Sequence, residues 1–304
     1  MSQEASSTLI IMQASRVRHS ENFYQTADGL RLFERCWEPD GLSKGLIYII
    51  HGLAEHGGRY DKAIGHLTEA GYAVSLTDLR GHGRSDGPRA FVSSFSLYLQ
   101  DLENSLFRIR QRERRKRIFL LGHSMGGLIA ALYTTERTPD IGGLILSGPV
   151  AEPGAGVSLL AVVAAKALSR FLPRLPLQRI ETAAISRDPE VVKSYVDDPL
   201  VHHGGISAKM GGEMLSAMER LRRGMACIQM PLLILHGGAD RIVSVEGSRN
   251  LCEAVGSKDK KLIVYENLYH EIMNEPEHRQ VLDDIVNWLN DRTNSACSGG
   301  SRRL

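Results

Sequence analysis

The sequence predicts an α/β fold in which a mostly parallel sheet is flanked by helices. Short apolar runs rich in valine, isoleucine and leucine alternate along the chain with longer segments of helical periodicity. Continuous apolar runs of this length are typical of strands that are buried on both faces, as in a parallel sheet. Their alternation with helices predicts helices on both sides of that sheet.

The expected elements can be placed in order along the chain. We expect strands at residues 45–50, 72–76, 117–121, 143–147, 232–235 and 261–265. We expect helices at residues 61–70, 96–115, 127–136, 245–254 and 277–290. An antiparallel hairpin is expected before them, because residues 21–37 contain two β-rich runs separated by the turn signal Asp28-Gly29.

One connection interrupts this alternation. The chain from Pro149 to Met230 is about 80 residues long, whereas a crossover between parallel strands needs only about a dozen. It has a helical pattern broken by prolines, and it is too long for an unstructured loop in a compact domain. The sequence therefore predicts a helical cap inserted into a single core. The expected units are core residues 1–149, a cap at 150–224, core residues 225–294 and a disordered tail at 295–304.

The bulk composition excludes several classes of protein. The 304-residue chain is 42% hydrophobic and carries a formal net charge of +2, which gives no reason to expect nucleic acid as a partner. Its four cysteines are far apart and lack metal-binding spacing, so we expect free thiols and neither a metal nor a cofactor. The N-terminus lacks the features of a secretory signal, and no window reaches the roughly 18 apolar residues that span a bilayer. We expect a cytoplasmic protein whose contact with membranes, if any, is peripheral.

The segment GHSMG, residues 122–126, directly follows an expected strand and precedes an expected helix. In a G-x-S-x-G pattern, the small residues allow a sharp turn that lifts the serine hydroxyl clear of the sheet. The helix N-terminus behind the turn favours negative charge. This context predicts that Ser124 is a nucleophile.

A serine hydroxyl needs a base to take its proton, and the base needs an acid to orient it. Asp240 follows the expected strand at 232–235, and His270 follows the final expected strand. Because ligands bind beyond the carboxyl ends of parallel strands, both residues are expected at the same edge of the sheet as Ser124. The chain order Ser, Asp, His is that of α/β-hydrolases. We therefore predict a catalytic triad of Ser124, Asp240 and His270.

Acyl transfer also needs two backbone N–H groups aimed at the oxygen on which negative charge develops. One is expected from Met125, the residue after the nucleophile. The other is expected from the loop after the strand at 45–50, where His51-Gly52 lets the backbone turn close to the substrate. Leu53 is placed to donate this second N–H.

Five segments of the chain together resemble monoacylglycerol lipases and related lysophospholipases. They are HGLAEHGGRY at 51–60, TDLRGHGRSDG at 77–87, GHSMGG at 122–127, GGADRIV at 237–243 and the Tyr-His pair at 269–270. The resemblance covers roughly residues 23–289. It implies an α/β-hydrolase fold and a serine esterase that cleaves monoacylglycerols to glycerol and fatty acid through an acyl-enzyme intermediate.

The same resemblance implies a set of substrate-binding residues. Tyr195, in the cap segment SYVDDPLV, matches a tyrosine that these lipases carry near their glycerol-binding pocket. By the same matching, Glu55 and Arg59 belong to the polar end of that pocket. His123, beside the predicted nucleophile, completes the set.

Other functions remain open at this stage. The same scaffold supports lysophospholipases, broad-specificity carboxylesterases and peptidases, because a fold does not determine its substrate. A non-catalytic binding protein is a further alternative, but such a protein usually lacks a triad member and this chain has all three. The apolar cap favours a substrate with a greasy acyl chain.

One cap segment has two interpretations. Twelve of the sixteen residues at 157–172 are apolar, which is too short a run to cross a bilayer comfortably. The segment either packs on the core, as most amphipathic helices do, or forms a lid that docks on a membrane. In the second case Lys166 and Arg170 would reach the lipid headgroups.

Overall fold

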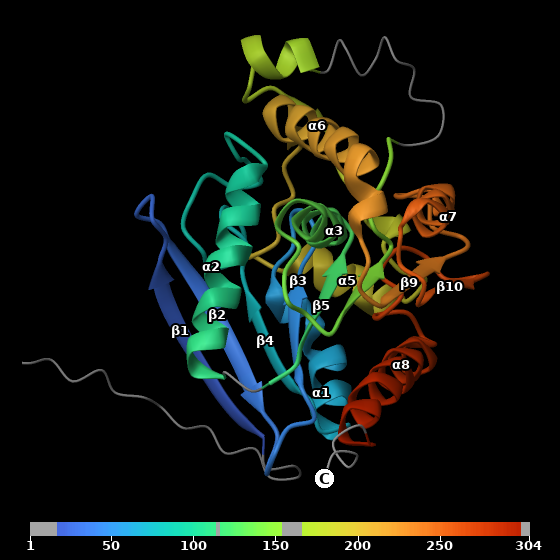
Figure 1. Cartoon of the computed structure of the whole chain (residues 1–304). Helices are drawn as coiled ribbons and strands as arrows, with labels where there is room; N and C mark the ends of the chain where they lie inside the picture. Colours follow the sequence, from blue (N-terminus) through green and yellow to red (C-terminus); the bar gives the residue numbers. More distant parts are fainter. Residues whose placement is uncertain (1–16, 114–115, 154–165, 299–304) are drawn as a thin grey trace, which may run out of the picture.

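The computed structural model describes residues 17–113, 116–153 and 166–298 (Figure 1). Eight strands form one sheet: β1 (Arg18–Gln25), β2 (Arg31–Glu38), β3 (Leu46–Ile50), β4 (Ala73–Thr77), β5 (Ile118–His123), β6 (Gly143–Ser147), β9 (Leu232–Gly237) and β10 (Lys260–Tyr265). Their order across the sheet is β1-β2-β4-β3-β5-β6-β9-β10. The strands β4, β3, β5, β6, β9 and β10 pair with one another in parallel. Strands β1 and β2 form the expected antiparallel hairpin, and β2 is also antiparallel to β4.

Helices cover both faces of this sheet (Figure 1). They are α1 (Asp61–Glu69), α2 (Ser96–Arg112), α3 (Met125–Arg137), α7 (Val245–Ala254) and α8 (His278–Ser298). The six expected strands and five expected helices are all present, so the predicted α/β architecture is confirmed. Helix α3 begins two residues earlier than expected, because its first turn contains the glycines that follow Ser124.

The core consists of two apolar layers, one on each side of the sheet. Alternate residues of β3 point to opposite faces, as the period of two in a strand requires. Tyr48 packs in the layer that includes buried residues of α2, α3 and α7. Ile47 and Ile49 pack in the layer with α1 and α8. The near-continuous apolar sequence of the strand is thus explained by burial on both sides.

The long connection between β6 and β9 folds above the carboxyl ends of the strands. Its described elements are β7 (Pro176–Gln178), the 3-10 turn η2 (Thr182–Ala184), α5 (Pro189–Asp197), β8 (Ile206–Ser207), α6 (Ala208–Gly224) and the 3-10 turn η3 (Met225–Cys227). Helix α6 packs against α3 of the core. The division into a core and a cap at residues 150 and 224 remains a proposal.

Backbone hydrogen bonds and several side-chain pairs connect the cap to the core, among them Arg187 with Glu275 and Arg220 with Glu136. The N–H of His202 donates to the carbonyl of Ala54 at 2.8 Å, and the N–H of Glu271 donates to the carbonyl of Ile185 at 2.7 Å. A side-chain pair spans the same boundary, with His56 Nε2 2.8 Å from an oxygen of Asp198. These contacts fix the position of the cap over the carboxyl ends of the strands.

The C-terminal helix differs from the expectation for the tail. We expected disorder from residue 295, but α8 continues to Ser298, and residues 299–304 of the expected tail lie outside the described part of the chain. Ala296 favours a helix, whereas the Gly299-Gly300 pair that follows disfavours one.

Within the described residues, no helix is long and apolar enough to cross a membrane. The same part of the chain contains no group of three or more histidine, cysteine or acidic side chains arranged to hold a metal ion. Asp78, which follows β4, accepts hydrogen bonds from the N–H groups of Gly57 and Arg84 at 2.9 Å each. Its carboxylate therefore organises the turns around it.

The two-layer core predicts the effect of a cavity. Leu235, in β9, is 0% exposed, while Leu42 is 102% exposed. Leu235→Ala should lower the free energy of unfolding by about 2–5 kcal/mol, because it removes buried methyl groups and leaves a void. Leu42→Ala is the matched control and should change the free energy by less than about 0.5 kcal/mol. Denaturant titrations of the two variants measure both values, and similar losses would contradict this description of the core.

Candidate active site

Ser124 stands at a sharp turn between β5 and α3. Its backbone has φ 55° and ψ −119°, a conformation that an L-residue rarely adopts. Two glycines make the turn sterically feasible. A Cβ atom at Gly126 would collide with the carbonyl of Ile50 in β3, and one at Gly122 would collide with the carbonyl of Gly126. The strand and the helix approach each other this closely only because both positions lack a side chain.

Asp240 and His270 are joined by a hydrogen bond, as expected for the predicted pair. His270 Nδ1 lies 2.7 Å from Asp240 Oδ2. The other carboxylate oxygen accepts the N–H groups of Ile242 and Val243 at 2.8 and 2.9 Å. Burial opposes ionisation of Asp240, but the charge of His270 and these hydrogen bonds outweigh it and hold the pKa of the carboxyl well below its usual value. Asp240 is therefore ionised throughout the neutral range.

A second histidine beside Asp240 was not predicted from the sequence. His236 is fully buried, and its Nε2 lies 3.1 Å from the carbonyl of Val243 and 3.3 Å from Asp240 Oδ2. Its Nδ1 is 2.7 Å from Ser248 Oγ, which fixes the orientation of the ring. The sequence feature that could have identified His236 is its position as a polar residue at the end of the apolar run at 232–235. His236 and His270 thus both lie beside the same oxygen of the Asp240 carboxylate.

Several groups act on the proton affinity of His270. Burial alone would lower its pKa, but the charge and hydrogen bond of Asp240, together with the carboxylates of Glu271 and Glu55, raise the pKa above its ordinary value. The Nδ1–H that donates to Asp240 leaves the lone pair of neutral His270 on Nε2. The ring therefore presents a base on its other side.

One cavity of about 310 Å³ brings most of the predicted site residues together. Of these residues, the lining includes Leu53, Glu55, His123, Ser124, Tyr195 and His270. Asp240 lies behind His270, and Met125 is buried beneath the turn. Arg59 lines a small neighbouring space instead of the main cavity.

The loop that carries Leu53 is held in place by buried side chains. Glu55 Oε1 accepts the N–H of Gly52 at 2.5 Å. His51 Nε2 accepts the N–H of Leu79 at 2.8 Å, and burial lowers the pKa of His51 to about 3, so the ring is neutral. Ala54 has φ 68°, which marks a strained turn. Such a loop presents its remaining N–H groups in a fixed direction.

Both predicted oxyanion donors have free backbone N–H groups within the described part of the chain. Neither Leu53 nor Met125 donates its N–H to a described acceptor. Met125 is the first residue of α3, where an N–H has no partner within the helix. Both N–H groups are therefore available to a substrate oxygen.

Arg59 is the centre of a buried cluster of charges. Its Nη2 donates to Glu271 Oε2 at 2.6 Å, and its Nε lies 3.5 Å from Glu55 Oε2, in ion-pair but not hydrogen-bond geometry. The guanidinium also covers the ring of Tyr195 at 4.7 Å. Burial and the neighbouring carboxylate of Glu271 raise the pKa of Glu55. Two carboxylates thus share one cation in a region shielded from water.

Glu271 is the second site residue that sequence reasoning missed. Its carboxylate lines the main cavity and accepts the side-chain amide of Asn274 at 2.9 Å, in addition to its bond with Arg59. The residue directly follows the predicted base His270. An acidic side chain next to the base is the sequence feature that could have identified Glu271 as a site residue. Its partner Arg59 is 212 residues away in the sequence, so the pairing depends on the fold.

His123 contributes a neutral ring to the cavity. Its Nδ1 donates to the carbonyl of Ser147 at 3.0 Å, and its ring centroid is 4.7 Å from that of His270. Burial, and secondly the charge of His270, hold the pKa of His123 well below its usual value. A neutral ring does not compete with His270 for the negative charge of Asp240.

Comparisons with known proteins agree with this geometry. The Hydrolase_4 family model, described as serine aminopeptidase, S33, matches residues 41–277. The monoacylglycerol lipase of Mycolicibacterium smegmatis is 37% identical over 270 residues, which are 89% of this chain and 96% of that protein. The chain belongs to the monoacylglycerol lipase family. The resemblance stated from the motifs is therefore confirmed.

Further members of the monoacylglycerol lipase family extend the match. The human monoglyceride lipase is 37% identical over 274 residues, covering 89% of this chain and 90% of that protein. The crystal structure of the monoacylglycerol lipase of Paleococcus ferrophilus is 35% identical, with a TM-score of 0.78 over 86% of this chain and 99% of that one. The predicted α/β-hydrolase fold is confirmed by this likeness.

The position of Glu271 predicts a change in pH dependence. The predicted base His270 must be neutral to act, so activity should fall as the pH drops through its pKa. Glu271→Gln removes one of the carboxylates that raise this pKa, along with Asp240 and Glu55. The acid limb of kcat/KM for a soluble ester should therefore move to lower pH, on the order of half a unit to one unit.

A matched control comes from the same loop. Glu266 is exposed and lies four residues before His270. Glu266→Gln removes the same charge, but water screens an exposed site much more strongly. The Glu266→Gln variant should therefore have the same acid limb of kcat/KM as the starting protein. An equal shift in both variants would show that overall charge, and not the buried cluster, sets the pKa.

Proposed function

We propose that this protein hydrolyses monoacylglycerols to glycerol and a fatty acid through an acyl-enzyme intermediate. The observation that carries the proposal is the single cavity in which Ser124 and His270 share their surroundings with the polar groups of Glu55 and Tyr195. The names of the related proteins, monoacylglycerol lipase and monoglyceride lipase, support the same substrate.

In the proposed mechanism, Ser124 is the nucleophile and His270 the general base. The Nε2 atom of neutral His270 takes the proton of the serine hydroxyl as the oxygen attacks the ester carbonyl. Asp240 holds the ring by its hydrogen bond at Nδ1 and stabilises the imidazolium that forms. The N–H groups of Leu53 and Met125 stabilise the oxyanion. His270 then returns its proton to the departing glycerol, and water hydrolyses the acyl-enzyme by the same steps.

The two ends of the cavity suit the two parts of a monoacylglycerol. Apolar side chains form much of the lining, among them Ile180, Ile185, Met214 and Met218. These residues come from the cap and provide a surface for the acyl chain. The polar end, formed by Glu55, His123, Tyr195 and the neighbouring Arg59, provides partners for the free hydroxyls of glycerol. His123 is placed there as a neutral donor or acceptor.

Other ester substrates are the main alternatives. The same cavity would accommodate a lysophospholipid or a simple carboxylic ester, and the family model is described by a peptidase name. A non-catalytic role is disfavoured, because the Asp240–His270 hydrogen bond and the Ser124 turn are both intact. Rates on monoacylglycerols, lysophospholipids, short esters and aminoacyl amides separate these possibilities.

We also propose that the cap contacts membrane surfaces. Residues 157–165 of the segment expected to dock lie outside the described residues. Lys166 was expected to reach headgroups, but in the structure its Nζ donates to Glu219 of α6 at 2.8 Å, because the helical residues 166–171 bring it beside that carboxylate. The residues that follow are more suitable for contact with lipid: Phe171 is 76% exposed and Leu172 is 54% exposed.

Removal of the nucleophile tests the mechanism. Ser124→Ala should reduce turnover by about 10⁶-fold, because without the hydroxyl no acyl-enzyme can form. A further change of Asp240→Asn should then add little, since the triad acts as a unit. Ser93→Ala, at an exposed serine outside the cavity, is the control and should retain full turnover. Substantial ester hydrolysis by the Ser124 variant would assign the nucleophile to another residue.

Substrate preference tests the polar end of the cavity. Monoacylglycerols should be cleaved faster than triacylglycerols of the same acyl chain, on the order of 10²-fold, because a triester lacks free hydroxyls and leaves buried polar groups without partners. Rates in matched mixed micelles measure this ratio. Equal rates on both lipids would contradict the proposed glycerol-binding role of Glu55, Arg59, His123 and Tyr195.

A further inference from the structure

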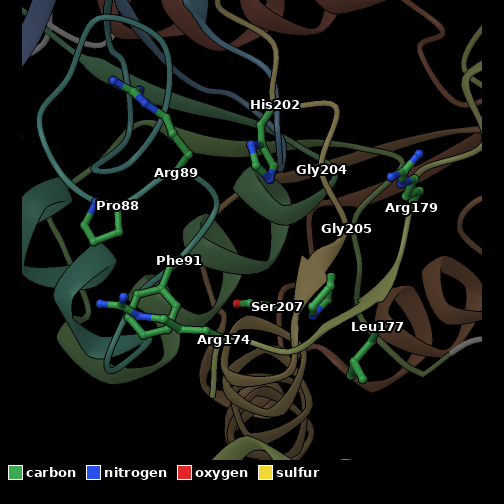
Figure 2. Close-up of a pocket in the computed structure, with 11 residues that line it drawn as sticks. Pro88, Arg89, Phe91, Arg174, Leu177, Arg179, His202, Gly204, Gly205 and Ser207 are labelled. Carbon is green, nitrogen blue, oxygen red and sulfur yellow. The ribbon is translucent and has the colours of Figure 1, made fainter. Parts of the chain in front are cut away.

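A second hollow, of about 680 Å³, lies beside β7 and β8 (Figure 2). The chain around Ile206 separates it from the catalytic cavity. Ile206 lines the catalytic cavity, while its neighbours Gly205 and Ser207 line the second hollow. Successive residues of an extended chain point to opposite sides. Arg179 borders both spaces.

The second hollow is strongly basic. Its lining contains Arg89, Arg174, Arg179 and His202 and no acidic residue. We call it the arginine hollow. Figure 2 shows Arg174 and Arg179 at opposite ends, with His202 and Ser207 between them. Three arginines in one concavity are a pronounced local concentration of charge in a chain whose net charge is only +2.

The charge of these arginines is largely uncompensated. Within the described part of the chain, neither Arg174 nor Arg179 forms an ion pair or a hydrogen bond. Arg89 donates to the backbone carbonyl of Gly83 at 2.9 Å, which leaves its charge unneutralised. Burial lowers the pKa of His202, and the charges of His203 and Arg89 contribute, so His202 is neutral at neutral pH. The positive potential of the hollow therefore comes from the guanidinium groups.

Exposed apolar side chains lie beside the arginine hollow. They are Phe171, Leu172, Leu175 and Leu177, which are 76%, 54%, 42% and 45% exposed. Leu177 and Phe91 also line the hollow itself. Within residues 171–179, exposed leucine and phenylalanine are thus interspersed with Arg174 and Arg179. Such a mixture is typical of surfaces that insert apolar groups into a membrane while cations stay at the headgroup level.

We propose that the arginine hollow binds the phosphate groups of anionic phospholipids at a membrane surface. The guanidinium fork matches phosphate oxygens in geometry as well as in charge. A dissolved phosphate ester would satisfy the arginines but would leave the neighbouring apolar side chains in water, so a membrane is the better partner. The proposal rests on the membrane contact proposed for the cap, and it assigns that contact a lipid class.

A binding assay without catalysis tests this proposal. The protein carries Ser124→Ala, so its binding is measured independently of any ester hydrolysis. It is sedimented with vesicles of phosphatidylcholine, alone or mixed with phosphatidylglycerol. The protein should bind the mixed vesicles more strongly. Arg174→Gln with Arg179→Gln should weaken that binding on the order of 25-fold, since each arginine at an anionic surface contributes about fivefold. Binding to the neutral vesicles should change little.

A matched control removes the same charge elsewhere. Arg18, in β1, and Arg222, near the C-terminal end of α6, are exposed and do not line the hollow. Arg18→Gln with Arg222→Gln should retain most of the binding to phosphatidylglycerol. Arg174→Lys with Arg179→Lys should give binding between that of the starting protein and that of the glutamine pair, because the charge is kept but the guanidinium fork that matches phosphate oxygens is lost. Thermal unfolding midpoints of all three double variants should match, as all four side chains are exposed.

Several results would overturn the proposal. One is an equal loss of binding in the control pair and the hollow pair. Another is equal binding of the starting protein to neutral and mixed vesicles. Release from vesicles by dissolved glycerol 3-phosphate, but not by sodium chloride of equal ionic strength, would identify a soluble phosphate ester as the ligand. Failure of the active protein to cleave monoacylglycerol would instead overturn the proposed function and leave the binding result unchanged.

Discussion

The structure depends on the close approach of β3, β5 and α3 at the turn that carries Ser124. A residue in this backbone conformation costs on the order of 1–3 kcal/mol, and it persists only where the surroundings enforce it. The N–H of Ser124 donates to the carbonyl of Ser147 at 2.9 Å, and Gly126 packs directly against the carbonyl of Ile50. The same contacts bring the loop after β3 to the serine. One strained turn therefore sets the positions of both the hydroxyl and the oxyanion donors.

The electrostatics of the site follow from an excess of buried carboxylates. Asp240 is balanced by hydrogen bonds and by the imidazolium that forms during the reaction, whereas Glu55 and Glu271 share one guanidinium. Each unit by which these groups raise the pKa of His270 corresponds to about 1.4 kcal/mol in favour of the protonated ring. The raised pKa makes His270 a stronger base when it takes the proton of the serine hydroxyl. It also narrows the pH range in which the free enzyme carries a neutral base.

Local sequence patterns predicted the fold and the expected triad residues. They could not predict contacts between segments that lie far apart in the sequence. Apolar runs located the strands, and the predicted triad followed because functional residues lie just after strands in a parallel sheet. Nothing local marks Glu271 as the partner of Arg59, 212 residues away. The arginine hollow is likewise assembled from three segments, at 88–91, 174–179 and 202–207. In the sequence these arginines form no motif, and only the fold places them around one space.

The cap is connected to the reaction centre by its backbone as well as by its lining. His202 borders the arginine hollow, and its N–H holds the carbonyl of Ala54, the residue after Leu53. Ala54 is itself in a strained conformation, so its geometry depends on such partners. On the other side of the cavity, Glu271 donates its N–H to Ile185 of the cap. The surface proposed to meet lipid and the loop proposed to bind the oxyanion therefore belong to one hydrogen-bonded unit, and a displacement of the cap would act directly on the geometry of that loop.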